Sequence, residues 1–244
     1  MTADGPLRDA APPWAALLHV DGEGCVWIAA PPLPSGTPTT ATLVRTTVGG
    51  SFISASESKP GTRLPASCPE LHVNPDASFC LARRSYRITR DTDVSAFWQD
   101  LGEFLVNQHH AARRGRWPAG RWLSHGPVAA DRQAEAEAAA FRIGFDAEYE
   151  ACLEADEGWI ADRARLPHAR ISRAGPCPRG CQDDASRPIP FRACRHGAVI
   201  QRIVDAERSR RAAQAAYFGA LRRLGTKCCG RIPGCPLDEE RIAA

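Results

Sequence analysis

Residues 72–81 read His72-Val73-Asn74-Pro75-Asp76-Ala77-Ser78-Phe79-Cys80-Leu81, and this stretch decides how the first half of the chain is interpreted. A Pro-Asp pair after an extended run is typical of a tight turn. The thiolate of a cysteine is a nucleophile, and a nearby amide can donate a hydrogen bond to an oxyanion. The stretch therefore indicates a nucleophilic Cys80. The residues alone also allow a core cysteine that follows a simple hairpin turn.

The sequence before this stretch predicts a small antiparallel sheet. Apolar and β-branched runs occupy residues 14–20, 25–30, 41–48 and 51–54. The Asp21-Gly22-Glu23-Gly24 segment between the first two runs is a hairpin signal. We expect residues 70–80 to cross the face of this sheet.

Helical periodicity replaces the strand pattern after Cys80. It predicts helices at residues 93–112, with Asp93 as the N-cap, and at residues 128–156 and 197–224. In the second helix an apolar stripe is expected to form core or an inter-domain surface; it consists of Phe141, Phe145, Tyr149 and Cys152. The predicted fold class is α+β.

The stretch from His72 to Leu81 resembles the active-site segment of ubiquitin-conjugating enzymes, where a His-Pro-Asn triplet shortly precedes the cysteine that takes ubiquitin as a thioester. It is most similar to conjugating-enzyme-like proteins of bacterial operons, whose segments read roughly His-x-Asn-x-Asp-Gly-x-x-Cys-Leu. Two departures are Val73 in place of the proline and Ala77 in place of the turn glycine. The order of a strand meander, a cysteine segment and a helix also fits, over residues 14–126, without the usual N-terminal helix.

The resemblance implies a role for each residue of the motif. Cys80 would be the thioester cysteine, Asn74 would order the loop and stabilise the oxyanion, and His72 would hold the loop by hydrogen bonds. The partners implied are a ubiquitin-like modifier, its activating enzyme and an unknown protein target. A role in anti-phage defence is implied in the same way, and no soluble cofactor is needed.

Six of the ten cysteines lie between residues 177 and 235, near the end of the sequence. Zinc prefers four Cys or His ligands, commonly in closely spaced pairs with Gly or Pro between them. Cys177 and Cys181 form one such pair, and the other ligand candidates are Cys194, His196, Cys228, Cys229 and Cys235. The spacing predicts structural zinc, as one ion or two. Thiols without a metal are the alternative.

Composition sets further limits. The 43% hydrophobic and 24% charged residues are ordinary for a globular protein. No apolar run approaches the roughly 18 residues of a membrane helix, so we expect no membrane partner. The N-terminus lacks a basic start followed by an apolar run, so the expected location is the cytoplasm. Metal ligands or catalytic thiols are then expected before disulfides.

Charge is distributed unevenly along the chain. Residues 1–70 carry four basic and six acidic side chains, whereas residues 187–235 carry eleven basic and two acidic ones. The basic end suggests an acidic partner surface. We expect the arginines between residues 208 and 223 to face solvent and to dock an acidic protein.

The sequence thus predicts three regions and a leading function. The regions are a ubiquitin-conjugating-like domain at 1–126, a helical linker at 127–173 and a cysteine-rich zinc module at 174–244. The leading function is a conjugating enzyme, an acyltransferase with a cysteine thioester intermediate.

Two alternatives come from other classes of protein. A non-catalytic zinc-containing scaffold with a degenerate conjugating fold is favoured by the missing proline and glycine of the motif. A nucleic-acid-binding zinc protein is favoured by the basic segment. We expect no nucleic-acid partner, because few aromatic residues are interleaved with the basic ones.

Overall fold

The computed structural model describes residues 4–81, 85–118, 124–166, 175–233 and 235–238. The chain forms two compact units. The first unit comprises residues 1–118 together with 225–244, and the second comprises residues 119–224. The second unit is therefore an insertion in the first along the sequence. This division differs from the three consecutive regions expected from the sequence.

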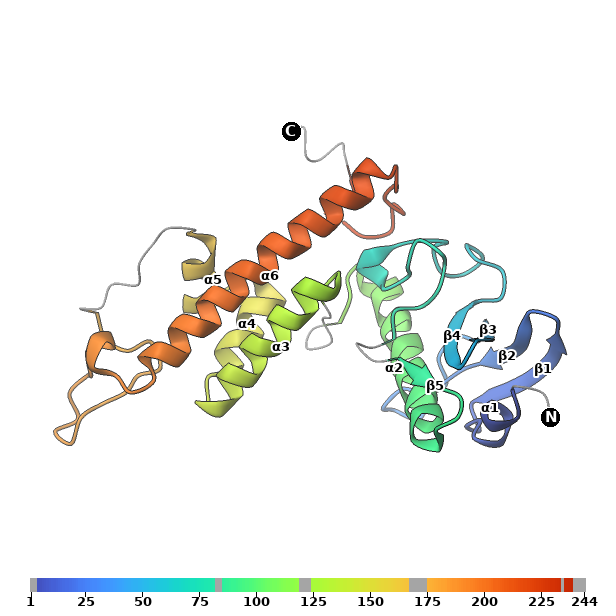
Figure 1. Ribbon diagram of the computed structural model, residues 1–244, viewed down its shortest axis with the longest axis horizontal. Coiled ribbons are helices and arrows are strands. Elements are labelled where there is room, and N and C mark those ends of the chain that lie inside the picture. The colour runs from blue at the N-terminus through green and yellow to red at the C-terminus, as the bar shows by residue number, and fades with distance from the viewer. Residues whose placement is uncertain (1–3, 82–84, 119–123, 167–174, 234, 239–244) are drawn as a thin grey trace. The chain divides into compact units, whose positions relative to one another are not determined.

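The first unit is built on a five-stranded antiparallel meander (Figure 1). Its strands are β1 (Ala15–Asp21), β2 (Gly24–Ala29), β3 (Thr42–Gly49), β4 (Phe52–Glu57) and β5 (Tyr86–Arg87). The predicted hairpin joins β1 and β2, and Gly24 is required there because a Cβ would collide with the carbonyl oxygen of Thr46. The four predicted strands are confirmed. The two-residue β5 is too short to give a periodic signal.

One face of the sheet is covered by the long helix α2 (Asp91–Arg114). Edge-to-face aromatic packing joins the two layers, with the ring of Trp98 lying 4.9 Å from that of Trp27. The helix ends at Gly115, whose φ of +66° suits the left-handed position after a helix. Asp93 is not the N-cap that we expected. The helix begins two residues earlier, and the Asp93 carboxylate accepts the backbone N–H of Arg87 at 3.0 Å.

A short helix precedes the sheet, contrary to the expectation that no N-terminal helix is present. This helix, α1 (Gly5–Asp9), places Leu7 in the core with no exposed surface. The indole nitrogen of Trp98 donates a hydrogen bond of 3.2 Å to the Leu7 carbonyl oxygen. Five residues with two glycine or proline positions carry too little helical pattern to be recognised in the sequence.

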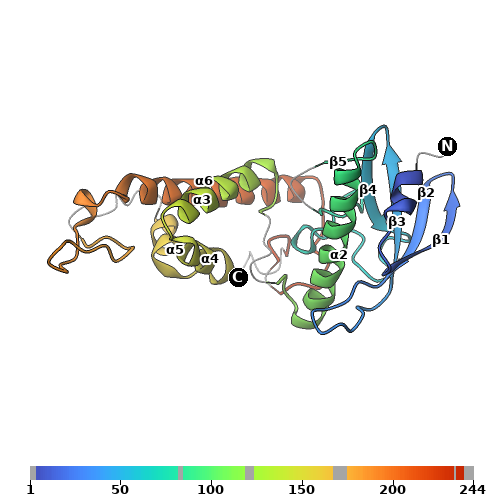
Figure 2. The ribbon, with the colours of Figure 1, turned by 90° about the horizontal axis from the view of Figure 1, so that it is seen from below.

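The second unit is helical. It contains α3 (Pro127–Arg142), α4 (Asp146–Ala155), α5 (Gly158–Arg165) and α6 (Gly197–Arg223). Helices α3 and α6 run side by side, as Figures 1 and 2 show from two directions. The predicted helix at 197–224 is confirmed. The helix predicted at 128–156 is two helices, because the chain turns at Gly144 with a φ of +60°.

The helices expected to form a linker instead share a core with α6. Phe145, Tyr149 and Cys152 of the predicted stripe are buried in that core, but Phe141 is 78% exposed. The break at Gly144 rotates Phe141 out of the stripe, since α4 starts a new helical face. Among the described helices of the chain, none combines the length and the apolar character that crossing a membrane requires.

Candidate active site and metal centres

Cys80 ends a small hairpin that adds to the edge of the sheet. The Asn74 N–H donates to the Ser78 carbonyl oxygen at 2.8 Å, and the Cys80 N–H donates to the His72 carbonyl oxygen at 2.8 Å. Val73 pairs with Phe79 between them, so His72 and Cys80 occupy opposite positions of the hairpin. The structure corrects the expectation that this segment crosses the sheet face, because the Phe79 N–H donates to the carbonyl oxygen of Ala55 in β4.

The turn of this hairpin explains the glycine in the His-x-Asn-x-Asp-Gly-x-x-Cys-Leu pattern that the stretch resembles. Ala77 has a φ of +66°, in the left-handed region that glycine adopts without a Cβ penalty. Asp76 compensates by accepting both the backbone N–H and the hydroxyl of Ser78, at 3.0 and 2.6 Å. The turn therefore forms with alanine at this position.

Asn74 is held inside the turn. Its side-chain amide donates a hydrogen bond of 3.0 Å to the Ser78 hydroxyl, which in turn binds Asp76. This arrangement orders the loop, the first of the two roles expected for Asn74. Donation to an oxyanion at Cys80 would require the amide to leave the Ser78 hydroxyl, and it stays a prediction.

His72 lies beneath the hairpin and not beside the solvent. It is 3% exposed, has a φ of +54° and packs its ring 4.6 Å from that of Trp117. It follows the single 3-10 turn η1 (Pro69–Leu71), whose Leu71 carbonyl accepts the side chain of Gln108 in α2. A buried ring at this place fits a structural role in the loop.

Helix α2 supports the hairpin from the core side. Phe79 stacks on Phe104 with ring centres 4.5 Å apart, and Gln108 binds the turn that precedes His72. Cys80 itself is half-buried. Burial raises the pKa of its thiol above the ordinary value of 9.0. The resting side chain is thus a neutral thiol at pH 7, and it becomes a nucleophile when the proton is removed.

A second group of candidate residues converges at the start of α6. The sulfurs of Cys177, Cys181 and Cys194 lie within 4.8 Å of one another. The His196 Nδ1 lies 3.4 Å from the Cys181 sulfur and 3.9 Å from the Cys194 sulfur. Three sulfurs and one imidazole nitrogen are a donor set that zinc prefers in structural sites. The three cysteines lie close enough together to hold a metal ion, and His196 is placed beside two of them as a candidate fourth ligand.

The local backbone explains how this cluster forms. The Cys177 N–H donates to the Ile189 carbonyl, and the Ile189 N–H donates to the Cys181 carbonyl, both at 2.9 Å. Gly180, with a φ of +74°, makes the sharp turn between the two cysteines. The 3-10 turn η2 (Phe191–Ala193) then leads into Cys194, directly before α6.

The other predicted metal ligands lie in a different unit. Cys228, Cys229 and Cys235 belong to the first unit, and Cys177, Cys181 and Cys194 belong to the second. The connecting helix α6 has 27 residues and is about 40 Å long. Ligands at its two ends cannot share one ion. Among the described residues, the group that lies close enough together to hold a metal consists of Cys177, Cys181 and Cys194, and metal binding by the three later cysteines stays a prediction.

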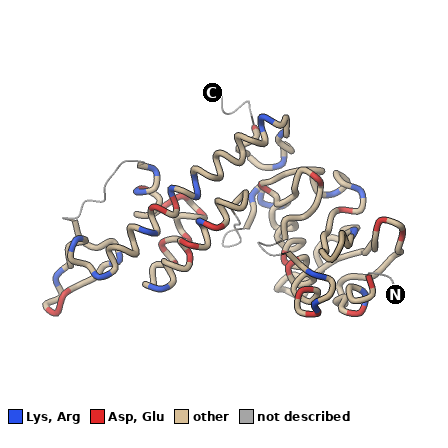
Figure 3. Tube along the Cα trace, viewed as in Figure 1, with Lys and Arg blue, Asp and Glu red and all other residues tan. Residues whose placement is uncertain are grey.

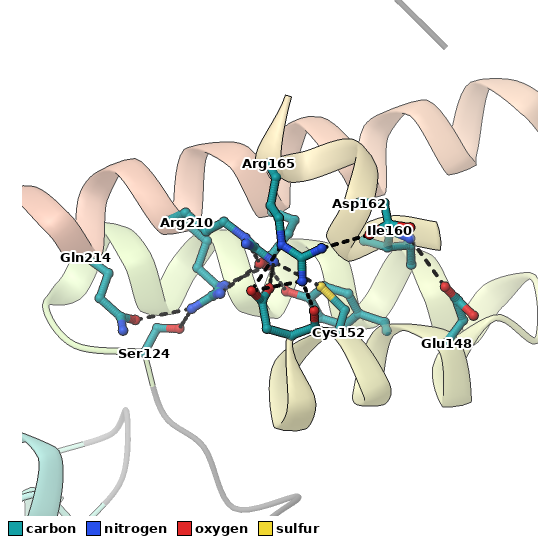
Figure 4. Close-up of polar contacts among 12 residues, drawn as sticks. Ser124, Glu148, Cys152, Ile160, Asp162, Arg165, Arg210 and Gln214 are labelled. Atoms are coloured by element: carbon teal, nitrogen blue, oxygen red, sulfur yellow. Dashed lines mark hydrogen bonds and ion pairs between the residues drawn. The ribbon is translucent and has the colours of Figure 1, made fainter. Parts of the chain in front are cut away.

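Three arginines of α6 make contacts within the second unit, whereas Arg222 is half-buried and Arg223 is exposed. Docking of an acidic protein on this helix stays a prediction. Glu207, whose side chain has no exposed area, accepts Arg210 Nε at 2.6 Å and Arg211 Nε at 2.7 Å. Arg210 also donates to Ser124 and Gln214, as Figure 4 shows. Arg208 donates to the Leu166 carbonyl. These three cations stabilise the second unit, in which both acidic and basic residues are present (Figure 3).

The electrostatics of this unit follow from burial and the arginines. Burial raises the pKa of Glu207, but hydrogen bonds from Arg210 and Arg211 outweigh it and hold that pKa below 4.5. Burial, with a smaller effect of Arg210, lowers the pKa of His125 to about 4. His125 packs between the rings of Tyr217 and Phe218 at 6.0 and 5.2 Å.

Sequence reasoning missed two residues of these sites. Cys68, which seemed an isolated cysteine, has its sulfur 2.9 Å from that of Cys229. Glu207 is one of only two acidic residues between residues 187 and 235. An acidic residue among so many arginines is a sequence signal of a paired, buried carboxylate.

Comparisons with known proteins identify two consecutive families in the chain, and the three cysteines after α6 fall within the second match although they belong to the first compact unit. Residues 19–119 match the prokaryotic E2 domain family, and residues 124–237 match a family described as the cysteine-rich domain, C-terminal to E2 domain. No curated protein and no solved structure matches the chain. The first match spans the sheet, the hairpin and α2, and the second spans every cysteine from Cys152 to Cys235. The chain is therefore a prokaryotic E2-domain protein that carries the cysteine-rich domain C-terminal to it.

Proposed function

We propose that this protein carries a ubiquitin-like modifier as a thioester on Cys80 and transfers it to a target. The Cys80 thiolate attacks the thioester carbonyl that links the modifier's C-terminus to a cysteine of the activating enzyme. A new thioester forms on Cys80, and the activating enzyme's thiol leaves. An amine of the target then attacks the same carbonyl, and Cys80 is released as a thiol while the amine loses a proton.

One observation carries the proposal. Within the residues that match the prokaryotic E2 domain, the half-buried Cys80 ends a hairpin whose backbone is fixed to His72 on one side and to β4 on the other. A nucleophile on a rigid scaffold supports attack on a carbonyl that a partner presents, because the reacting atom is already placed. The raised pKa keeps the thiol protonated, and therefore unreactive, until a partner is bound.

The metal group of the second unit belongs to the same proposal. Cys177, Cys181, Cys194 and His196 would hold a structural Zn²⁺ that stabilises residues 175–197. Such an ion ties two turns to the start of α6, and its binding energy would contribute to folding. The cysteine-rich domain would recruit the activating enzyme, the modifier or the target. A role in anti-phage defence is part of the proposal.

A loading assay tests the function. The purified protein is incubated with an activating enzyme and a modifier encoded beside its gene, together with ATP, and is analysed on gels without reductant. We expect an adduct of the modifier's size that reductant removes. Cys80→Ala should abolish it, whereas Cys25→Ala, a buried cysteine of the same unit, should not. Cys80→Ser should give an oxyester that resists reductant.

The second step is tested separately with Asn74→Ala. An oxyanion donor acts in the transition state, so loss of the amide should slow discharge to an amine by about 100-fold. Asn74→Asp, which keeps the size but cannot donate, is the matched control and should be equally slow. Loading that survives Cys80→Ala, or a protein that binds the modifier and never forms an adduct, would overturn the proposal in favour of the scaffold alternative.

A further inference from the structure

Cysteines from two distant segments of the first unit form two neighbouring pairs of thiols. The sulfurs of Cys68 and Cys229 lie 2.9 Å apart. The thiols of Cys228 and Cys235 form a second hydrogen-bonded pair, and Cys235 is close enough to Cys68 to interact with it electrostatically. Cys68 and Cys235 are buried, at 1% and 3% exposure. Cys68 precedes the hairpin of Cys80, and the other three follow α6.

The backbone supplies a donor to one of these sulfurs. The Gly230 N–H lies 3.4 Å from the Cys228 sulfur, within the turn that carries both Cys228 and Cys229. Such a donor stabilises a thiolate, since a hydrogen bond to the charged form favours it. Metal-bound cysteines are thiolates, so this turn is arranged for coordination.

From this geometry we propose that Cys68, Cys228, Cys229 and Cys235 bind a second Zn²⁺ ion in the first unit. Four thiolates are a donor set that closed structural zinc sites use. The turns needed for it are present, because Gly230 has a φ of +70° and Pro233 and Pro236 flank Cys235. Arg231 lies beside the cluster and donates to the Arg63 carbonyl, which places a cation near the excess negative charge of four thiolates.

The ion would fasten the last part of the chain to the turn beneath the Cys80 hairpin. Cys68 and Val73 exchange two backbone hydrogen bonds of 2.9 and 3.0 Å, and Val73 pairs with Phe79 in the hairpin. Fixing Cys68 therefore fixes the support of the cysteine loop. This role does not depend on whether Cys80 carries a modifier, so it is tested without the conjugation reaction.

The experiment measures metal per chain in the full-length protein purified under reducing conditions. We expect two Zn²⁺ per chain in the wild type, one in Cys68→Ser and Cys235→Ser, and one in Cys177→Ser. The double variant Cys68→Ser/Cys177→Ser should hold none. Cys25→Ser, a buried cysteine of the same unit in β2, is the control and should retain both ions.

Hydrogen exchange reports how firmly residues 68–80 are held, which the metal content alone does not show. In Cys235→Ser the amides of residues 68–80 should exchange at least about tenfold faster than in the wild type, as local opening becomes easier. In Cys177→Ser they should exchange at the wild-type rate. Cys229→Ser, at a half-buried position, repeats the test if Cys68→Ser does not fold.

Three results would overturn the site. They are full zinc content in Cys68→Ser or Cys229→Ser, a wild-type protein whose whole zinc content disappears in Cys177→Ser, and a Cys68–Cys229 disulfide found by mass spectrometry after alkylation without reductant. Failure of the loading assay leaves all three measurements interpretable, since none of them uses the modifier.

Discussion

The backbone N–H of Cys80 donates a 2.8 Å hydrogen bond to the carbonyl oxygen of His72. Backbone atoms make this contact, so the hairpin does not require the Cys80 side chain. Substitutions at Cys80 therefore report on its chemistry and not on the fold of the loop. The same cannot be said of His72, whose buried ring packs against Trp117.

The raised pKa of Cys80 predicts slow alkylation at neutral pH. Only the thiolate reacts, and burial keeps its fraction small below pH 9. The rate with iodoacetamide, followed at the Cys80 peptide by mass spectrometry, should rise about tenfold per pH unit from 7 to 9. The same peptide in the denatured protein is the control and should react faster at pH 7. A folded protein that reacts faster than the denatured one would contradict this prediction.

Replacing Ala77 with glycine should stabilise the protein. The left-handed φ of +66° costs an L-residue about 1 kcal/mol, which glycine does not pay in the folded state. Part of this gain is lost to the greater freedom of glycine in the unfolded chain. The free energy of unfolding from denaturant titration should increase by up to about 1 kcal/mol. Ala66→Gly, which has no positive φ to relieve, should give no increase.

Glu207→Gln should destabilise the second unit strongly. The change removes the buried negative charge between Arg210 and Arg211 and leaves their charges partly uncompensated. Breaking a buried ion pair by removing one partner typically costs about 3–5 kcal/mol. Thermal unfolding followed by circular dichroism should show this loss of stability as a lower unfolding temperature of the helical unit. Glu150→Gln, at an exposed position of α4, should change stability by less than about 0.5 kcal/mol, and equal effects of the two substitutions would disprove the role of the network.

The strongly periodic elements of this chain were predictable from its sequence. Four strands and α6 were found because alternation and 3.6-residue periodicity persist over enough residues there. The break between α3 and α4 was not found, since Gly144 is a single residue within a continuous Ala- and Glu-rich run. The conformation of Ala77 was foreseeable only from the motif, because the alanine itself gives no signal of a left-handed turn.

The loss of stability on acidification should be traceable to His125. Its pKa is about 4 in the folded protein and near 6.5 when unfolded, so between these values the unfolded chain binds the proton more tightly. Above pH 6.5 His125 makes its full contribution to the free energy of unfolding. As the pH decreases towards 4, that contribution falls by about 3 kcal/mol in total. His125→Phe should flatten the stability profile in that range.

The metal group of the second unit predicts a local change on zinc loss. Cys181→Ser should lose one ion and expose residues 175–197 to trypsin, with cleavage at Arg179, Arg192 and Arg195. The reason is that turns held by a metal have little core of their own. Cys152→Ala keeps the metal ligands and is the control. Resistance to trypsin in the zinc-free Cys181→Ser variant would argue against a structural ion.

The pairing of Cys68 with Cys229 shows what the sequence could not provide. Spacing identifies ligands that are neighbours along the chain, such as Cys177 and Cys181. It cannot identify partners that the fold brings together from two distant segments. The Glu207 network is hidden for the same reason. Its contacts to Ser124 through Arg210 and to Tyr149 join three segments that are far apart in the sequence.

The position of the second unit within the first has a consequence for synthesis on the ribosome. Domains generally fold in order from the N-terminus as they emerge. Here Cys235 and Leu237, each 3% exposed, belong to the same unit as the first strands. That unit cannot complete its core until residues 235–238 have left the ribosome. The helices of the second unit can fold earlier. We therefore expect the second unit to fold before the first unit is complete.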